Sequence, residues 1–177
     1  MLVECVPNFS EGRNPAVLRA LADAARSVDV KVLGLSADPD HNRSVMTIAG
    51  EGPAVLESVF RASRQALELI DLRSHQGSHP RMGAVDVVPF VPLDDTPMAY
   101  CVQLAEDLGR RFGTELQLPV YLYERAARRR ERVNLARVRH PEYEGLSTWM
   151  QEEAHRPDFG PHHPHPTGGA SAVGARW

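Results

Sequence analysis

Cysteine, lysine and long hydrophobic runs are all scarce in this 177-residue sequence. Its two cysteines, Cys5 and Cys101, both lie in apolar stretches. A secreted chain with a disulfide framework would carry more cysteines in paired spacings, so we expect a reduced, cytoplasmic protein. No apolar run approaches the roughly 20 residues that span a bilayer, and Glu4 and Pro7 interrupt any early signal-like stretch. We therefore expect no association with a membrane.

Charge excludes a second class of partner. The formal net charge is −3 at pH 7, whereas a nucleic-acid-binding domain is usually basic, so we expect no nucleic acid. Lys31 is the single lysine, and the other 19 basic residues are arginines. Arginine presents a planar fork of donors that suits carboxylates and phosphates. This bias fits an anionic ligand, although the base composition of a genome produces the same bias.

The chain is long enough for one domain, which we assign to residues 1–177. Five β-rich runs are expected to be strands: Leu2–Val6, Val30–Ser36, Arg43–Ala49, Ala84–Leu93 and Pro119–Tyr123. Three segments with apolar residues at helical spacing begin near a proline: Pro15–Val28, Pro53–Ile70 and Pro97–Phe112. Asn14 and Thr96 stand where N-cap residues are expected.

The order strand–helix–strand–strand–helix–strand is the split βαβ arrangement of ferredoxin-like folds. A third helix and a fifth strand extend it. We therefore expect an α+β sandwich, a ferredoxin-like mixed β-sheet with helices packed on one face, rather than a doubly wound parallel fold. Ala84–Leu93 is mostly apolar and should be a central strand buried on both faces. No glycine-rich phosphate loop follows any strand, which disfavours nucleotide binding.

The last part of the chain differs in composition. Arg125–Arg139 carries seven arginines against one acid, Glu131, and is typical of a solvated helix face or loop. Residues 157–169 are rich in proline and glycine and should be irregular. Ala170–Trp177 has strand character. His162, His163 and His165 are potential metal ligands, but prolines flank them and few acids stand nearby, so no metal is expected.

His79 is the strongest candidate for chemistry because it lies in a polar loop directly before the most apolar strand. Loops at a sheet end present side chains to ligands. Pro80 restricts the backbone of His79 to extended geometry, which fixes the direction of the imidazole. An imidazole titrates near neutrality and can accept and return a proton. The alternative is a loop histidine that only hydrogen-bonds its neighbours.

Two further polar loops are candidates. Asp38, Asp40, Asn42 and Arg43 lie between two expected strands, where they would either surround a polar ligand or form a plain hairpin turn. The loop at residues 7–13 precedes a helix N-terminus, which attracts anions, but it would serve equally as a strand-to-helix connection.

Taken together, the motifs resemble glutamate formimidoyltransferase. They occur in that family's order and spacing: Glu4–Arg13, Ala37–Arg43, His79–Asp86, Pro119–Tyr123 and Pro157–Pro161. Enzymes of this family transfer the formimino group of N-formimino-L-glutamate to N5 of tetrahydrofolate, in histidine degradation and one-carbon metabolism. The resemblance implies an α/β subdomain that binds substrate against a second, similar subdomain. It also implies that Trp177 lies near the end of the first subdomain.

The resemblance also implies that His79 matches the family's catalytic histidine and that tetrahydrofolate is the co-substrate. Loop placement adds further hypotheses. Arg43, Arg81 and Arg13 would bind the carboxylates of glutamate or folate, because arginine binds carboxylates in bidentate geometry, and Asp38 or Asp40 would orient His79 or hold the pterin. The segment that matches the family's folate-contacting loop supplies Gly160, Pro161, His162, Gly168 and Gly169.

Two functions remain open at this point. The first is a formimidoyltransferase that works as a homodimer or beside a separate second subdomain. The second is a non-catalytic folate-binding module, or a half-enzyme that lacks its other subdomain. Binding of folate without turnover would favour the second.

Overall fold

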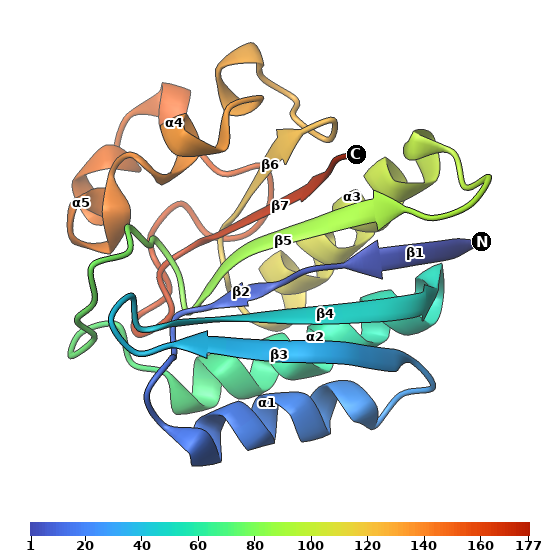
Figure 1. Cartoon of the computed structure of the whole chain (residues 1–177). Helices are drawn as coiled ribbons and strands as arrows, with labels where there is room; N and C mark the ends of the chain where they lie inside the picture. The colour runs from blue at the N-terminus through green and yellow to red at the C-terminus, as the bar shows by residue number, and fades with distance from the viewer.

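A single seven-stranded mixed sheet organises the computed structural model, which describes residues 1–177 (Figure 1). The strands are β1 (Leu2–Cys5), β2 (Asn8–Phe9), β3 (Lys31–Asp38), β4 (Arg43–Glu51), β5 (Val85–Pro92), β6 (Val120–Glu124) and β7 (Ser171–Ala175). The helices are α1 (Pro15–Arg26), α2 (Gly52–Leu69), α3 (Met98–Glu115), α4 (Leu135–Arg139) and α5 (Glu142–Trp149). Short 3₁₀ turns cover Arg130–Arg132 and Glu153–His155.

Strand order confirms the predicted α+β class. Across the sheet the strands run β3, β4, then β1 and β2 in line, then β5, β7 and β6. The first four positions are mutually antiparallel, which is the ferredoxin-like arrangement. β7 extends it by pairing parallel to β5, and β6 pairs parallel to β7 at the outer side. The predicted central position of β5 is confirmed, because every residue from Val85 to Phe90 is buried.

The strand pairing of the N-terminal segment extends further along the chain than expected and is interrupted at Pro7. Residues 7–13 were predicted as a loop, but Asn8 and Phe9 pair with both β4 and β5. Pro7 has no N–H to donate, so the ladder breaks there, although its carbonyl still accepts from the Met46 N–H at 3.0 Å. The sheet therefore continues past the proline as β2.

The helix start signals were correct for α1 and wrong in part for α3. The Asn14 side chain accepts from the Ala16 N–H at 3.0 Å and caps α1, with Pro15 in the first turn. Thr96 does not cap α3, since its hydroxyl donates to the Leu2 carbonyl at 2.8 Å and Pro97 takes the cap position. Thr96 therefore ties the start of α3 to β1.

Helices cover the two faces of the sheet unequally. α1, α2 and α3 lie together on one face, as predicted, and enclose the main core (Figure 1). The opposite face of β5, β6 and β7 is covered by α4 and α5, which had not been predicted. Alternation along the strands makes this possible: Val88 and Leu122 face the main core, whereas Tyr121 and Tyr123 face the second cluster. Leu33 of β3 remains 61% exposed, so nothing covers that end of the sheet.

The C-terminal segments follow the prediction with one exception. Residues 157–169 contain no helix or strand, and β7 lies within the expected Ala170–Trp177. The arginine-rich run is not merely solvated, because Arg132 is 4% exposed and pairs with Asp158 at 2.8 Å. Both cysteines are buried and unpaired. None of the helices combines the length and apolarity required to cross a bilayer.

Candidate functional site

The three polar loops singled out in the sequence meet at one end of the strands, beside the end of β3 and the starts of β4 and β5. The Gly12 N–H donates to the Asn42 side chain at 2.9 Å, and the Ser78 N–H donates to the Asp40 carbonyl at 3.2 Å. Gly12 is required here because a Cβ would lie 2.3 Å from the Asp38 carbonyl oxygen. The hairpin between β3 and β4 is thus also the surface on which the His79 loop rests. The hairpin interpretation of residues 38–43 is therefore confirmed, and binding of a polar ligand by them stays a prediction.

His79 lies among charged groups that come from three different elements. Its Nε2 accepts a long hydrogen bond, 3.5 Å, from Nη1 of Arg43 on β4. The same Nε2 is 3.9 Å from Oδ2 of Asp86 on β5, and Arg139 of α4 reaches that oxygen at 2.9 Å. The His41 ring packs edge-on, with centroids 6.2 Å apart. The imidazole is only 13% exposed.

This environment favours the neutral imidazole. Burial, together with the positive charges of Arg139 and Arg43, lowers the pKa of His79 to about 4. The Asp86 carboxylate opposes this, but Arg139 lies closer to it than His79 does and offsets its charge. Burial raises the pKa of Asp86, while Arg139 and the Met82 N–H at 2.8 Å act in the opposite direction. At neutral pH His79 is therefore an available base.

We expect the His79 imidazole to titrate with a midpoint near pH 4, followed by NMR of its ring carbons. Since the folded pKa is below the unfolded value, the unfolded chain takes up the proton first, and His79 makes the fold less stable as pH falls from about 6.5 toward 4. Arg43→Gln removes one positive charge and should raise the midpoint. A midpoint at or above 6.5 in the unaltered chain would contradict the described surroundings.

Arg81 holds the His79 loop rather than facing an open space. Its guanidinium is 8% exposed and binds both carboxylate oxygens of Glu144, at 2.7 and 2.9 Å. Its Nε also donates to Nδ1 of His75 at 3.0 Å, and His75 Nε2 donates to the Asn42 carbonyl at 3.1 Å. This chain of contacts fastens the loop to α5 and to the β3–β4 turn. A direct role of Arg81 in ligand binding stays a prediction.

The other hairpin residues have mainly local partners. The Asp38 carboxylate accepts from the Asp40 and His41 N–H groups and from the His41 ring at 2.7 Å, which lowers the pKa of Asp38. Asn42 adopts φ 52° and bridges two loops, because its amide also donates to the Gln76 carbonyl at 2.9 Å. Arg43 is thus the hairpin side chain that hydrogen-bonds His79, while the His41 ring packs edge-on against it. Arg13 instead donates to the Pro39 carbonyl at 2.7 Å.

The proline- and glycine-rich segment approaches the His79 motif at one end only. The Gly168 carbonyl accepts from the Ala84 N–H at 3.0 Å, and Gly169 forms a bridge with Gly83. Gly160, with φ 86°, packs instead against the Leu118 carbonyl at the start of β6, and Pro161 follows it there. His162 is exposed. Folate contact by these five residues stays a prediction.

Gly169→Ala tests how tightly that segment is built. Gly169 has φ 66°, and a Cβ there would lie 2.1 Å from the Met82 carbonyl oxygen. We expect a loss of about 1–3 kcal/mol in the free energy of unfolding, measured by denaturant titration. Gly145→Ala is the matched control, because only the Pro141 Cβ lies near, at 3.8 Å, and the site is helical. Equal stability of the two variants would contradict the prediction.

The sequence did not single out two residues of this cluster. Asp86 was quoted only as the end of a motif, since an acid inside an apolar strand carries no spacing signal of its own. Arg139 was included in a run expected to be solvated, yet its side chain is 17% exposed and pairs with Asp86. A carboxylate in an otherwise apolar strand was the one available signal, because burying it requires a partner.

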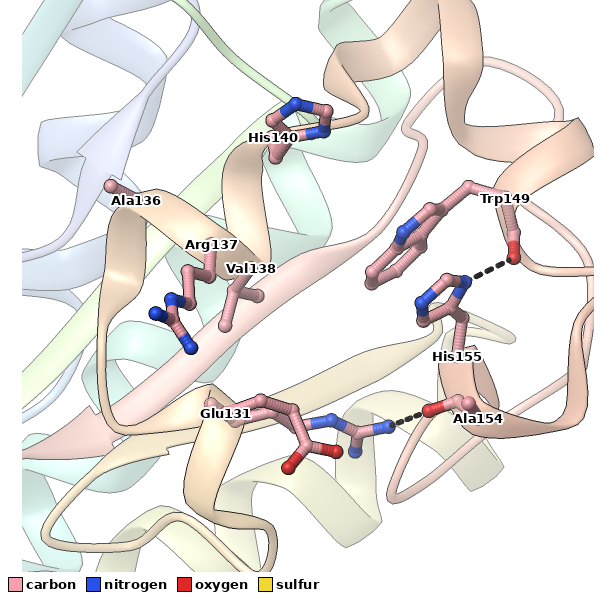
Figure 2. A pocket seen from close by; sticks show the side chains of 9 residues that line it. Glu131, Ala136, Arg137, Val138, His140, Trp149, Ala154 and His155 are labelled. Carbon is pink, nitrogen blue, oxygen red and sulfur yellow. Dashed lines mark hydrogen bonds between the residues drawn. The ribbon is translucent and has the colours of Figure 1, made fainter.

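Three cavities border α4: one of about 340 Å³, lined by Pro80 and Arg139 among others, and two more. The larger, about 410 Å³, lies away from His79 and is lined by Trp149, His155, Val138 and Arg137, among others (Figure 2). The Trp149 and His155 rings stack there with centroids 4.2 Å apart. The smaller, about 260 Å³, lies on the sheet and includes Arg43 and Arg139, the two guanidiniums that border His79.

Residues 2–176 match the family model of the formiminotransferase domain, N-terminal subdomain. The chain belongs to this formiminotransferase family. It is 50% identical over 99% of its length to a glutamate formimidoyltransferase of Thermoplasma acidophilum, covering 58% of that relative. It is 46% identical to the glutamate formimidoyltransferase of Streptococcus pyogenes and 44% to the rat formimidoyltransferase-cyclodeaminase, covering 59% and 32% of them.

The formiminotransferase match confirms the family inferred from the sequence motifs. It also sets a limit, because the chain spans about three fifths of the two formimidoyltransferases and a third of the rat protein. Relatives with both kinds of name align over nearly all of this chain. The shared part is therefore the formiminotransferase N-terminal subdomain.

Proposed function

We propose that this chain takes part in transferring the formimino group of N-formimino-L-glutamate to tetrahydrofolate, with His79 as general acid and base. One observation carries the proposal: a mostly buried, neutral histidine stands between Arg43 and the Asp86–Arg139 pair, where β4 and β5 begin. The names of the relatives support the reaction class. Perturbed histidines of this kind mark candidate catalytic sites.

The chemistry requires two proton transfers. N5 of tetrahydrofolate attacks the formimino carbon, an N–C bond forms, and N5 must lose its proton. The bond between that carbon and the glutamate nitrogen then breaks, and this nitrogen must gain a proton to leave as an amine. His79 accepts the first proton at Nε2 and returns it to the leaving nitrogen, so no net proton is consumed.

The surrounding charges suit such a shuttle. A histidine whose pKa is about 4 accepts a proton only briefly, so its protonated form is a strong acid toward the leaving nitrogen. Asp86, 3.9 Å from Nε2, stabilises the imidazolium while it exists. Burial raises the pKa of Asp86, and the Arg139 guanidinium at 2.9 Å opposes that rise. Both groups are therefore positioning residues in this proposal.

The site of transfer is proposed to need a second subdomain. The chain covers about three fifths of the formimidoyltransferases it resembles, and the face of β3 and β4 opposite the core helices is open. A second subdomain, or a second copy of this chain, would cover this open face. We propose that the assembled protein acts in the cytoplasm, in histidine degradation and one-carbon metabolism.

The alternative is a folate-binding module without transfer activity. The short coverage of the relatives favours it. Incubating the 177-residue chain with tetrahydrofolate and formiminoglutamate, and measuring released glutamate, separates the two. Release above the uncatalysed rate supports transfer by the chain itself. Release of glutamate only after addition of the C-terminal part of a relative supports the half-enzyme. Binding of tetrahydrofolate without release of glutamate in either mixture supports the binding module. If the chain neither binds tetrahydrofolate nor releases glutamate, both functions are contradicted.

A further inference from the structure

The 410 Å³ cavity is separate from the proposed site of transfer (Figure 2). It shares no lining residue with the cavity that includes Arg43 and Arg139. Its walls come from α4 and its C-cap, from Trp149 at the end of α5 and from the two 3₁₀ turns. The volume lies within the range of about 300–1,000 Å³ that is typical of small-molecule sites. The cavity is therefore large enough to hold a ligand of its own.

One wall of this cavity is a stack of aromatic rings. The Trp149 indole and the His155 imidazole are almost parallel, with an angle of 11° and centroids 4.2 Å apart. Tyr121 packs against the indole and donates its hydroxyl to the His155 carbonyl at 2.6 Å, while the buried Arg132 guanidinium lies over the Tyr121 ring. These contacts hold the wall in place before a ligand arrives, which lowers the entropic cost of binding.

The aromatic wall carries two polar atoms that have no partner in the chain. His155 Nδ1 lies 3.0 Å from the Trp149 carbonyl, which only accepts, so this nitrogen carries the proton and Nε2 of the neutral ring is a free acceptor. The indole N–H of Trp149 is a free donor. Both rings face Val138 of α4 across the cavity (Figure 2). The cavity thus offers one donor and one acceptor beside an apolar surface.

Two charged side chains of the lining are also unpaired, and they have opposite signs. Arg137 and Glu131 are exposed, and neither forms an ion pair or a side-chain hydrogen bond within the chain. The charge of Arg132 is offset by Asp158 at 2.8 Å. Arg137 can bind a carboxylate through two parallel hydrogen bonds, and Glu131 can accept from an ammonium group. A zwitterionic head group would therefore satisfy both.

We propose that this cavity binds an α-amino acid with a heteroaromatic side chain. The ring lies between Val138 and the Trp149–His155 pair, accepts from the indole N–H and donates to Nε2 of the imidazole. The carboxylate binds Arg137 and the ammonium group binds Glu131. Histidine is the common amino acid whose ring has both a donor and an acceptor, so it is the probe of choice. The proposal does not depend on the function proposed above.

Proton–nitrogen NMR of the 177-residue chain tests the site, because each tryptophan gives one indole N–H signal. The chain has two tryptophans, and Trp177 is 74% exposed and lies outside the lining. We expect histidine to shift the Trp149 signal saturably, with a roughly millimolar Kd, and to leave the Trp177 signal in place. The variant Trp177→Phe assigns the two signals. The titration is run above neutral pH, where the imidazole of free histidine is uncharged.

Three matched probes separate the requirements of the site. Leucine keeps the zwitterion without a planar ring, histamine lacks the carboxylate, and imidazolepropionate lacks the ammonium group. Each should bind about 5-fold or more weakly than histidine, because each leaves part of the lining without its partner. Any of the three binding as tightly as histidine would contradict the ligand class.

Variants of α4 locate the bound ligand. Ala136→Phe should abolish the shift, because it fills the cavity from an exposed position. Arg137→Gln should weaken histidine about 5-fold or more and leave histamine unchanged, since histamine has no carboxylate. Arg130→Gln, an exposed arginine outside the lining, is the control and should bind histidine normally.

Three results would overturn the site. They are no saturable shift of the Trp149 signal, unchanged histidine binding in both Ala136→Phe and Arg137→Gln, and displacement of histidine by tetrahydrofolate. The last would make the cavity part of the transfer site. If histidine binds as expected but no assembly of the chain transfers formimino groups, the proposed function fails and the amino-acid site stands.

Discussion

His79→Gln should lower kcat of formimino transfer by about 10²–10⁴-fold, because it removes the group that carries the proton between two nitrogens. Glutamine fills similar space and still hydrogen-bonds, but it does not titrate. Arg43 and Asp86 make only long contacts to Nε2, at 3.5 and 3.9 Å, so little folding energy depends on the ring. The rate is measured as glutamate released by the assembled transferase, and circular dichroism checks the fold.

The control for this experiment is His163→Gln, since His163 is exposed and its Nδ1 contacts only the carbonyl of its neighbour Pro164. It should leave kcat unchanged. A His79→Gln protein with a near-normal rate would remove His79 from the mechanism. The Asp86–Arg139 pair would then be the next group to test.

Arg132→Met should produce the largest loss of stability. Arg132 and Asp158 are 5% and 6% exposed and pair at 2.8 Å, and Arg132 also donates to the Arg156 carbonyl at 2.6 Å. Removing one member leaves a buried carboxylate without its partner, which costs about 3–5 kcal/mol. For a chain of this size we expect Tm to fall by roughly 6–20 °C, measured by calorimetry.

Two comparisons separate the charge effect from simple loss of an arginine. Arg130→Met alters an exposed residue of the same 3₁₀ turn and should shift Tm little. Adding Asp158→Leu to Arg132→Met removes both charges and should recover part of the loss, although the Leu122 N–H then loses its 2.8 Å acceptor. A double variant less stable than Arg132→Met alone would argue against a buried-charge effect.

Local patterns were enough for most elements. The proline-led helices and the β-rich runs all exist, because caps, branched side chains and apolar spacing act within a few residues. The pattern was not enough for β2, where two residues pair only because β4 and β5 lie on either side. It also missed α4 and α5, since Leu135–Arg139 is too short and too basic to show an apolar period.

The sequence alone determined the family, the α+β fold and the importance of the His79 loop, because these depend on motif order and on short-range propensity. Only the tertiary structure showed what surrounds His79. Asp86 and Arg139 are 53 positions apart in the sequence, yet they form an ion pair beside the imidazole. Burial and the nearby charges of Arg43 and Arg139 then lower the pKa of His79, and neither burial nor proximity in space can be read from local sequence.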